Sequence, residues 1–252
     1  MPDEVPLVGG NVGVDVVRVG DTVRRPAGPW SASVDALLLH LEAVGFEAAP
    51  RALGYDDQGR QVLSYIDGSI DADPADLDPA QLSLVGRTIR EFHAASASFS
   101  PPPGAVWNVA IAPDRQDLIC HHDLAPWNLV RAQRPVIIDW DGAGPGSRLW
   151  DLSYAAHGFV PLSPSARLDP TTEGRRFAAL VNGYGLGDAE RVELLGLLVP
   201  RIWSMHELLA TGHREGRETW RRLWAEGHGD AWAADAAYTE QRQERLRIAL
   251  LP

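Results

Sequence analysis

Lysine is absent from this chain of 252 residues, so all 23 of its basic residues are arginine. Cysteine is nearly absent as well. The single Cys120 excludes an internal disulfide and a zinc site built from several cysteines, and this scarcity is typical of a reducing compartment. No apolar run approaches the length that spans a membrane, and the acidic start Met1-Pro2-Asp3-Glu4 is unlike a basic signal peptide. We therefore expect a soluble, cytoplasmic protein without a membrane partner.

Positive charge is scarce relative to negative charge, with 23 basic residues against 34 acidic ones and a net charge of −11. A protein that binds nucleic acid normally carries a basic surface, so a nucleic-acid partner is not expected. The acidic balance is compatible with a cationic small substrate, and equally with a general contribution to solubility. The composition does not indicate the oligomeric state.

The first part of the chain reads as short strands and turns around one helix. Strands are expected over residues 12–19, 22–25, 51–55 and 61–66. Between the two strand pairs, Ser31 or Ser33 is the expected N-cap of a helix that Gly45 ends. These patterns predict a small sheet with one helix.

The remainder of the chain is mainly helical. Asp78 and Pro79 predict the start of a helix, and Asp188 is the expected cap of a long helix that Pro200 should kink. Between them, residues 135–140 are apolar enough to form a buried strand. We therefore expect an α+β fold with two lobes. The expected boundaries are residues 1–67 for a β-rich N-terminal lobe and residues 68–252 for a helical C-terminal lobe.

One stretch of polar residues carries the strongest chemical signal. The sequence from His121 to Asn128 fits the pattern His-x-Asp-x-x-x-x-Asn, and Asp139 follows at the end of the apolar strand. Phosphoryl transfer requires a carboxylate at the attacking hydroxyl and oxygen ligands that hold Mg²⁺ against the phosphates. Asp123 can serve as the carboxylate, and Asn128 with Asp139 as the ligands. The competing interpretation is that these residues only form turns and caps, where Asp and Asn are common.

Two segments resemble the aminoglycoside phosphotransferase family, whose members have a kinase-like fold with two lobes. They are residues 121–130 and residues 136–151, and the second contains Ile138-Asp139-Trp140-Asp141-Gly142. The resemblance implies that Asp123 is the catalytic residue, that Asn128 and Asp139 bind the metal, and that His121 supports the loop. It also implies that Asp151 braces the catalytic loop, although an ordinary helix N-cap explains Asp151 equally well.

The nucleotide is expected against the N-terminal lobe. Residues proposed to contact it are Gly10, Asn11, Arg24, Ser64, Tyr65 and Ile66. The family's phosphate-binding lysine has no counterpart, so Arg24 is expected in its place and Arg25 is the alternative. An arginine keeps the charge and can bind phosphate with two hydrogen bonds, but its shape differs from that of lysine. The glutamate that orients this lysine in the family has no clear match, and Asp35 and Glu42 are candidates for it.

The acceptor is expected on the helical lobe. Tryptophan rings and carboxylates can bind a cation there, and the candidates are Trp203, Trp232, Glu207 and Asp230. The alternative is that these residues belong to the core and to solvated helix faces. Cys120 is expected to be a small buried residue rather than a nucleophile, and His93 to form a structural hydrogen bond.

The sequence therefore predicts a kinase that moves the terminal phosphate of ATP (or GTP), with Mg²⁺, to a hydroxyl of a small cationic molecule similar to an aminoglycoside. One alternative is a metabolite kinase of the same fold that acts on a sugar, a choline-like alcohol or an amino alcohol. The other is a pseudokinase that binds nucleotide without transfer, which the missing lysine favours and the intact Asp123, Asn128 and Asp139 oppose.

Overall fold

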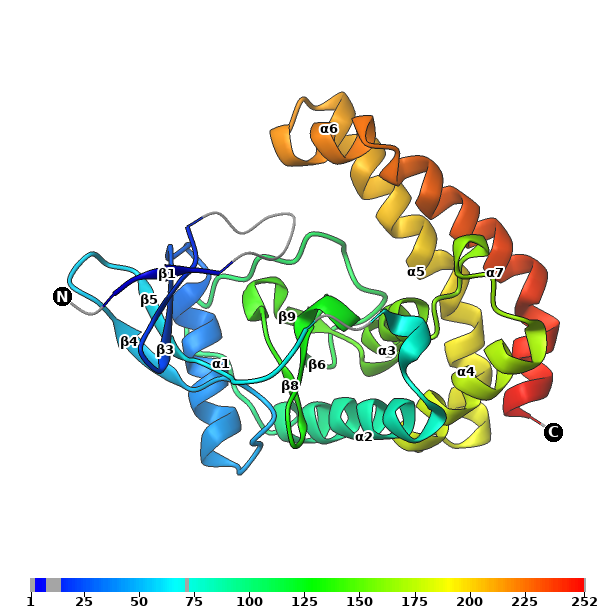
Figure 1. Cartoon of the computed structure of the whole chain (residues 1–252), viewed down its shortest axis with the longest axis horizontal. Coiled ribbons are helices and arrows are strands. Elements are labelled where there is room, and N and C mark those ends of the chain that lie inside the picture. The colour runs from blue at the N-terminus through cyan, green and yellow to red at the C-terminus, as the bar shows by residue number, and fades with distance from the viewer. Residues whose placement is uncertain (1–2, 8–14, 71–72, 252) are drawn as a thin grey trace.

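The computed structural model describes residues 3–7, 15–70 and 73–251. Its N-terminal part is an antiparallel sheet with the strand order β1-β2-β3-β5-β4, and its later part is mainly helical (Figure 1). The strands are β1 (Val5–Pro6), β2 (Val17–Val19), β3 (Thr22–Arg25), β4 (Ala52–Tyr55) and β5 (Gln61–Ser64). The expected order of a β-rich part followed by a helical part is confirmed.

The helix of the N-terminal part, α1 (Ser31–Ala43), packs one apolar face into the core. Leu37, Leu38 and Leu41 are almost completely buried there, at the helical spacing that the sequence predicts. The expected serine cap is wrong, because Trp30 occupies the N-cap position and makes no side-chain capping bond. The hydroxyl of Ser31 instead accepts a hydrogen bond from the N–H of Gly28.

Helix α2 (Pro79–Ser96) begins as predicted. The side chain of Asp78 accepts a hydrogen bond from the N–H of Gln81, and the side chain of Gln81 accepts one from the N–H of Asp78. This reciprocal capping box satisfies two amides at the helix start. Helix α4 (Pro170–Tyr184) packs closely against α2, because Gly86 and Gly183 lie at the contact. A Cβ atom at Gly86 would come within 2.1 Å of the Leu180 carbonyl oxygen, and one at Gly183 equally close to that of Ser83.

Two short two-stranded sheets lie beside α2 and position the loops between their strands. Strand β6 (Leu118–Cys120) pairs with β9 (Gly144–Gly146), and β7 (Leu129–Arg131) pairs with β8 (Pro135–Ile137). The predicted buried strand is confirmed for residues 135–137. It ends there because Trp140 already belongs to the short 3₁₀ helix η3 (Trp140–Gly142).

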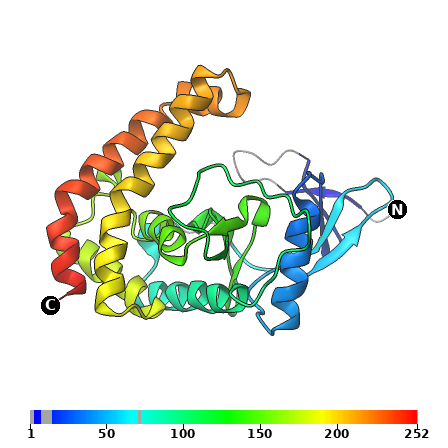
Figure 2. The same cartoon turned by 180° about the vertical axis from the view of Figure 1, so that it is seen from behind.

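Helices α3 (Arg148–Phe159), α5 (Asp188–Arg214), α6 (Glu218–Ala225) and α7 (His228–Leu250) complete the fold. In Figures 1 and 2, α5 and α7 lie side by side and project beyond the rest of the molecule, with α6 at their tip. The expected cap of α5 is wrong, because Gly187 and not Asp188 is its N-cap. Ser147 is the N-cap of α3, so the alternative interpretation of Asp151 as that cap is also wrong. Helix α5 continues on both sides of Pro200.

A single apolar core connects the two parts of the molecule. It includes Leu38 of α1, Phe92 of α2, Trp140 and Phe159, all nearly inaccessible to solvent. None of the helices in the described ranges combines the length and apolar character needed to cross a bilayer.

Candidate active site

The carboxylate of Asp151 is completely buried and supports the loop that follows β6. It accepts hydrogen bonds from the N–H groups of His121 (3.0 Å) and His122 (2.8 Å), and it lies 3.1 Å from Nε2 of His93. Burial alone would raise the pKa of Asp151, but the hydrogen bond to His93 and the neighbouring histidines outweigh it and lower the pKa. Asp151 therefore stays ionised and fixes the backbone of the loop.

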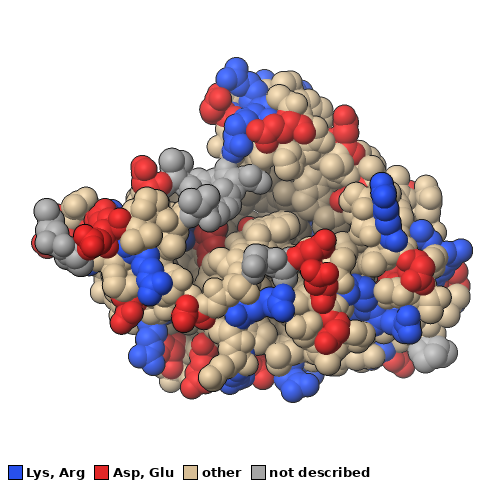
Figure 3. Space-filling model, viewed as in Figure 1, with Lys and Arg blue, Asp and Glu red and all other residues tan. Residues whose placement is uncertain are grey.

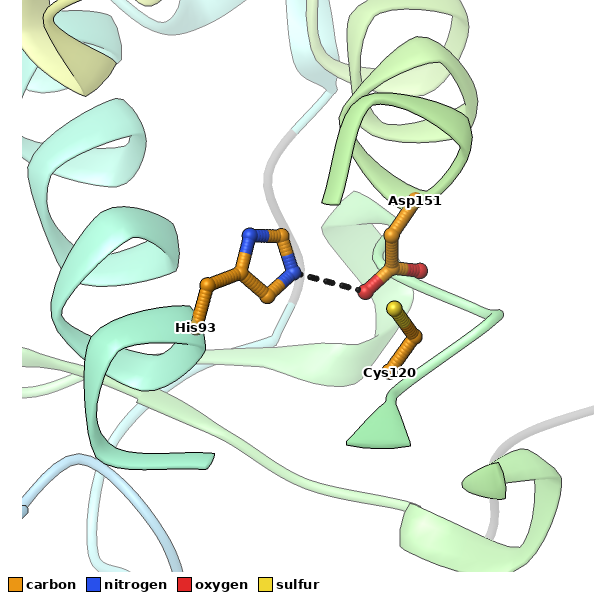
Figure 4. Close-up of side chains that lie close together, drawn as sticks. All are labelled: His93, Cys120 and Asp151. Carbon is orange, nitrogen blue, oxygen red and sulfur yellow. Dashed lines mark hydrogen bonds and ion pairs between the residues drawn. The ribbon is translucent and has the colours of Figure 1, made fainter. Parts of the chain in front are cut away.

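His93, Cys120 and Asp151 place one potential metal ligand each within 4.8 Å of one another (Figure 4). The nitrogen and oxygen atoms of this cluster are already engaged within the protein. Nδ1 of His93 lies 2.9 Å from the hydroxyl of Tyr184, and both oxygens of Asp151 accept backbone hydrogen bonds. The cluster is therefore a hydrogen-bonded support, and His93 forms the structural bonds that the sequence favours. Cys120 is a buried free thiol.

His121 joins the loop to the strand that precedes Asp139. Its Nε2 lies 3.0 Å from the carbonyl oxygen of Ile138, and its Nδ1 accepts a hydrogen bond of 3.3 Å from the N–H of Asp123. One neutral ring thus donates from Nε2 and accepts at Nδ1. The ring also packs edge-on against the buried Trp140, with 4.8 Å between the ring centroids.

Asp123 and Asn128 are linked directly. The Nδ2 group of Asn128 donates to the carboxylate of Asp123 over 2.7 Å and to the carbonyl oxygen of Asp123 over 2.9 Å. Both hydrogens of the amide are therefore used by Asp123, which directs the carbonyl oxygen Oδ1 of Asn128 away from it and makes that oxygen available as a ligand.

The β7–β8 hairpin brings Asn128 and Asp139 together. Leu129 is opposite Ile137 in the register, and the N–H of Ile138 donates to the carbonyl oxygen of Asn128 over 2.9 Å. Asn128 and Asp139 therefore flank the same end of the hairpin, although ten residues separate them. Asp139 has a left-handed backbone with φ of 58°, and half of its side chain is exposed.

Arg25 of β3 reaches across from the sheet to this end of the hairpin. Its Nη1 lies 3.3 Å from Oδ1 of Asp139, and its Nη2 contacts the carboxylate of Asp141. Arg25 is opposite Gln61 in the sheet, and Gln61 is buried against Asp35 of α1. Arg25 consequently lies on the face of the sheet that α1 covers.

Arg24 lies elsewhere, because neighbouring residues of a strand point to opposite faces. Its Nη1 pairs with Asp56 at 3.2 Å, in the turn between β4 and β5. Burial opposes ionisation of Asp56, but hydrogen bonds from Arg60 and Arg24 lower its pKa to about 2. The two candidates for the acid that orients this cation have other partners. Asp35 accepts a hydrogen bond from Gln61, and Glu42 pairs with Arg51 at 3.2 Å.

Residues Ser64, Tyr65 and Ile66 follow β5 at the connection to the helical part. The N–H of Tyr65 donates to the carbonyl oxygen of Asp21, and the guanidinium of Arg18 lies 3.7 Å from the centre of the Tyr65 ring. Strand β5 ends at Ser64, so the predicted strand over residues 61–66 is two residues too long and Ile66 lies beyond it. Gly10 and Asn11 lie outside the described residues.

The predicted acceptor residues lie in different environments, some packed against aromatic rings and others exposed on helices. Trp232 of α7 stacks on His157 of α3 at 4.5 Å between ring centroids, and it stacks on Tyr154 at 6.2 Å. His157 also pairs with Asp235 at 2.9 Å. Trp203 lies edge-on to His206, while Glu207 and Asp230 are exposed on the α5 and α7 helices.

Four further residues lie near Asp123 or Asp139 but are not part of the pattern formed by His121, Asp123, Asn128 and Asp139. They are Arg25, Asp141, Tyr154 and Arg201. Arg25 is already the alternative to Arg24 in the sequence, and Asp141 repeats the aspartate two residues after Asp139. The pKa of Asp141 is raised, mainly by burial. The charge of Arg25 opposes this shift, and the charge of Asp139 adds to it. Tyr154 and Arg201 are distant in sequence and reach the loop only through the fold.

Comparisons with known proteins identify the family. The model of the phosphotransferase enzyme family matches residues 105–195, which include the loop, strands β6 to β9 and α3. The trifolitoxin immunity protein of Rhizobium leguminosarum bv. trifolii is 35% identical over 220 residues, which cover 82% of this chain and 83% of that protein.

Several solved structures share the fold at lower identity. A choline/ethanolamine kinase family protein from Mesorhizobium loti has a TM-score of 0.61 at 18% identity, over 92% of this chain and 89% of that one. An amicoumacin kinase in complex with AMP-PNP, Ca²⁺ and its ligand has a TM-score of 0.64 at 13% identity, over 96% and 88%. Spectinomycin phosphotransferase with ADP and spectinomycin gives 0.52 at 12%, over 98% and 92%.

These neighbours confirm the expected kinase-like fold, and at such identities they establish the fold alone. The family assignment comes instead from the 35% identical relative and from the family model that spans the loop between Cys120 and Asn128. By these two matches, the chain belongs to the phosphotransferase enzyme family.

Proposed function

We propose that this protein transfers the terminal phosphate of ATP or GTP to a hydroxyl of a small cationic molecule. The observation that carries the proposal is the placement of Asp123, Asn128 and Asp139 around one end of the β7–β8 hairpin. A carboxylate for the hydroxyl and oxygen ligands for a metal ion are thereby assembled at one site, which is what phosphoryl transfer requires.

Asp123 is the proposed base. Asn128 holds one of its carboxylate oxygens, and the backbone of the loop is fixed by Asp151 and His121. An acceptor hydroxyl bound at this carboxylate would give its proton to Asp123 as the oxygen attacks the terminal phosphorus, the bond from that phosphorus to the bridging oxygen breaks and the nucleoside diphosphate leaves. The contribution of the protein is then mainly orientation of the hydroxyl and its proton.

The residues present fit a magnesium ion. Oδ1 of Asn128 and the carboxylate of Asp139 are hard oxygen donors on adjacent positions of the hairpin, and half of the Asp139 side chain is open to solvent. Asn128 and Asp139 would hold the ion, and Asp141 is the nearby carboxylate that extends this set. When bound, Mg²⁺ neutralises charge on the phosphates.

Arg25 takes the place that the family's lysine would have, in preference to the predicted Arg24. Its guanidinium already lies at Asp139, the proposed metal ligand, whereas the guanidinium of Arg24 is held by Asp56 in a turn of the sheet. A cation at Arg25 can bind a phosphate oxygen with charge-assisted hydrogen bonds. Gly10, Asn11, Ser64, Tyr65 and Ile66 remain the proposed contacts of the nucleotide itself.

The acceptor is proposed to bind beside Tyr154 and Trp232. Tyr154 interacts with Asp123, and Trp232 stacks on Tyr154, so a hydroxyl at Asp123 lies next to an aromatic surface. The net charge of −11 and the carboxylate of Asp235 favour a cation there. Figure 3 shows a hollow in the surface beneath the tip formed by α6.

The relative named for immunity to trifolitoxin favours a protective role. We propose that the acceptor is an antimicrobial compound similar to an aminoglycoside, which phosphorylation inactivates, and that the protein contributes to antibiotic resistance. A metabolite kinase acting on an amino alcohol is the alternative, because neighbours with this fold include choline/ethanolamine kinases.

A nucleotide-consumption screen tests the proposal. ATP and GTP are each incubated with Mg²⁺, the protein and a panel of basic antibiotics, amino alcohols and neutral sugars. We expect consumption that depends on one class of amine and that Asp139→Asn abolishes. If no compound raises consumption above that of Asp139→Asn, the protein is not a phosphotransferase for these acceptors, and persistent nucleotide binding would then favour a pseudokinase.

A further inference from the structure

Arg201 of α5 is a buried arginine in an unusual environment. Only 2% of the residue is exposed, and it is among the largest fully buried side chains. Within the part of the chain that the structure describes, it forms no ion pair with a carboxylate. An arginine that is removed from water without a direct counter-ion is unfavourable for stability, so its retention suggests another role.

The contacts of Arg201 are directed at the catalytic loop. Its Nη2 donates to the carbonyl oxygen of His122 over 3.1 Å, and its Nη1 donates to the hydroxyl of Ser204 over 3.3 Å. Its guanidinium lies 4.3 Å from the centre of the Tyr154 ring and 5.5 Å from that of Trp150. Its Nε is buried without a partner.

His122 needs this support because its backbone is strained. Its φ is 67°, in the left-handed region that residues other than glycine rarely adopt, and it directly precedes Asp123. The N–H of His122 is held by Asp151, and its carbonyl oxygen is held by Arg201. Both ends of the residue that orients Asp123 are thus fixed by buried charged side chains.

Tyr154 completes the connection to Asp123. Its ring is buried under the guanidinium of Arg201, and the carboxylate of Asp123 is near enough to act on its hydroxyl. Burial, and then the charge of Asp123, raise the pKa of Tyr154 well above its ordinary value. The phenol therefore stays protonated, so its hydroxyl is available as a donor for the carboxylate of Asp123.

We propose that Arg201 and Tyr154 are positioning residues that hold the carboxylate of Asp123 in its reactive orientation. Arg201 acts on the backbone of His122 and on the ring of Tyr154, and Tyr154 acts on the carboxylate itself. This inference rests on the proposed function, because it assigns Asp123 the reacting position. A purely structural role for the two residues would instead lower stability and leave turnover per folded molecule unchanged.

The most direct test is Tyr154→Phe, which removes one hydroxyl and leaves the ring in place. We expect kcat to fall by about tenfold, the amount that corresponds to one hydrogen bond, while the KM for the nucleotide changes little. Arg201→Met should lower kcat further, and Arg201→Lys should recover part of the loss because it restores a cation. The matched control is Tyr238→Phe, which removes a hydroxyl bonded to Glu173 at 2.6 Å, outside this site.

A second measurement does not depend on activity. Thermal midpoints of Tyr154→Phe, Asp123→Ala and the double variant should be non-additive, since either single change breaks the same contact. A kcat for Tyr154→Phe equal to that of Tyr238→Phe, or additive midpoints, would overturn the inference. Failure of the proposed function looks different: the unmodified protein would then transfer no phosphate, whereas the midpoints would still report whether Tyr154 holds Asp123.

Discussion

Arg25 and Asp139 form an ion pair between the sheet and the end of the β7–β8 hairpin, with 3.3 Å between Nη1 and Oδ1 across 114 residues of sequence. Half of the Asp139 side chain is exposed, so the pair contributes little to stability by itself. Its significance is positional. It places a permanent cation beside the proposed metal ligand in a chain that has no lysine to do so.

We expect Arg25→Ala to lower kcat/KM for the nucleotide by roughly 10- to 100-fold, because a charge-assisted phosphate contact contributes about 1.5–3 kcal/mol. Steady-state kinetics at varied ATP concentration would measure this loss. Arg24→Ala is the matched control, since it removes an arginine from the same strand. If Arg24→Ala were the impaired variant and Arg25→Ala normal, the cation for the phosphates would be Arg24, as first predicted from the sequence.

Asp123→Asn should abolish phosphate transfer and leave binding of the Mg²⁺–nucleotide complex intact, since the residue faces the hydroxyl. Asp139→Asn should weaken that binding as well, because it removes a charged ligand. Isothermal titration calorimetry with a non-hydrolysable nucleotide compares the two variants. Equal losses of affinity in both would show that Asp123 also binds the metal and would contradict its assignment as the base.

The stability of the protein should depend on pH through Asp151. Its pKa is lower in the folded protein than the ordinary value near 3.9, so its ionised form stabilises the fold above about pH 5 and this contribution is lost as the pH falls. We expect the difference in unfolding free energy between the wild type and Asp151→Asn to be largest near neutral pH. Urea unfolding from pH 7 to pH 3 measures it. A difference that stays constant over this range would contradict the depressed pKa.

Recognition of a cationic acceptor should be sensitive to salt and to the aromatic surface. Exposed charges are screened beyond about 8 Å at physiological ionic strength, so the acceptor KM should rise as salt is added. Trp232→Ala should raise the acceptor KM roughly three- to tenfold and leave the nucleotide KM unchanged. Glu207→Gln and Asp230→Asn test the two exposed acids in the same assay.

Glu240→Gln, an exposed acid on α7, is the control for these charge changes. An acceptor KM that is indifferent to salt, or a neutral compound used far better than every amine, would contradict the cationic assignment.

The contact between α2 and α4 should not tolerate a methyl group. Gly86→Ala places a Cβ within 2.1 Å of a backbone oxygen, so we expect a loss of more than about 1 kcal/mol of unfolding free energy. Gly196→Ala is the control, because that glycine lies within α5 and a Cβ there meets nothing within 4 Å. It should instead stabilise the protein by about 0.5–1 kcal/mol. Denaturant unfolding of both variants decides between steric crowding and helix propensity.

The sequence predicted those features whose physical cause is local. The reciprocal bonds of Asp78 and Gln81 follow from a spacing of three residues, and the helical pattern of α2 follows from its apolar positions. Asp123 and Asn128 could be proposed as site residues because their spacing within one loop is itself the requirement of the chemistry, and that assignment stays a prediction. The glycine-rich strand β9 was missed, because its residues carry no side-chain pattern typical of a strand.

The features set by tertiary contacts could not be predicted. Arg24 and Arg25 are adjacent, so a shift of one residue in strand register exchanges the faces on which they lie. Nothing in the local sequence indicates which face meets the hairpin. Arg201 contacts His122 across 79 residues, and its role becomes visible only when α5 is placed against α3. For Asp151 the sequence allows either a brace of the loop or a helix cap, and the structure gives the cap position to Ser147.

The single thiol of Cys120 can report local opening of the structure around β6. Its thiol is inaccessible to solvent at the end of β6, immediately before the residues that Asp151 holds, and burial, followed by the charge of Asp151, raises its pKa well above the ordinary value. A thiol reagent can therefore reach it only when this strand separates from its surroundings. Because the chain has no other cysteine, the rate of labelling measures how often this strand opens. A slower rate in the presence of a nucleotide or an acceptor would report binding without any turnover.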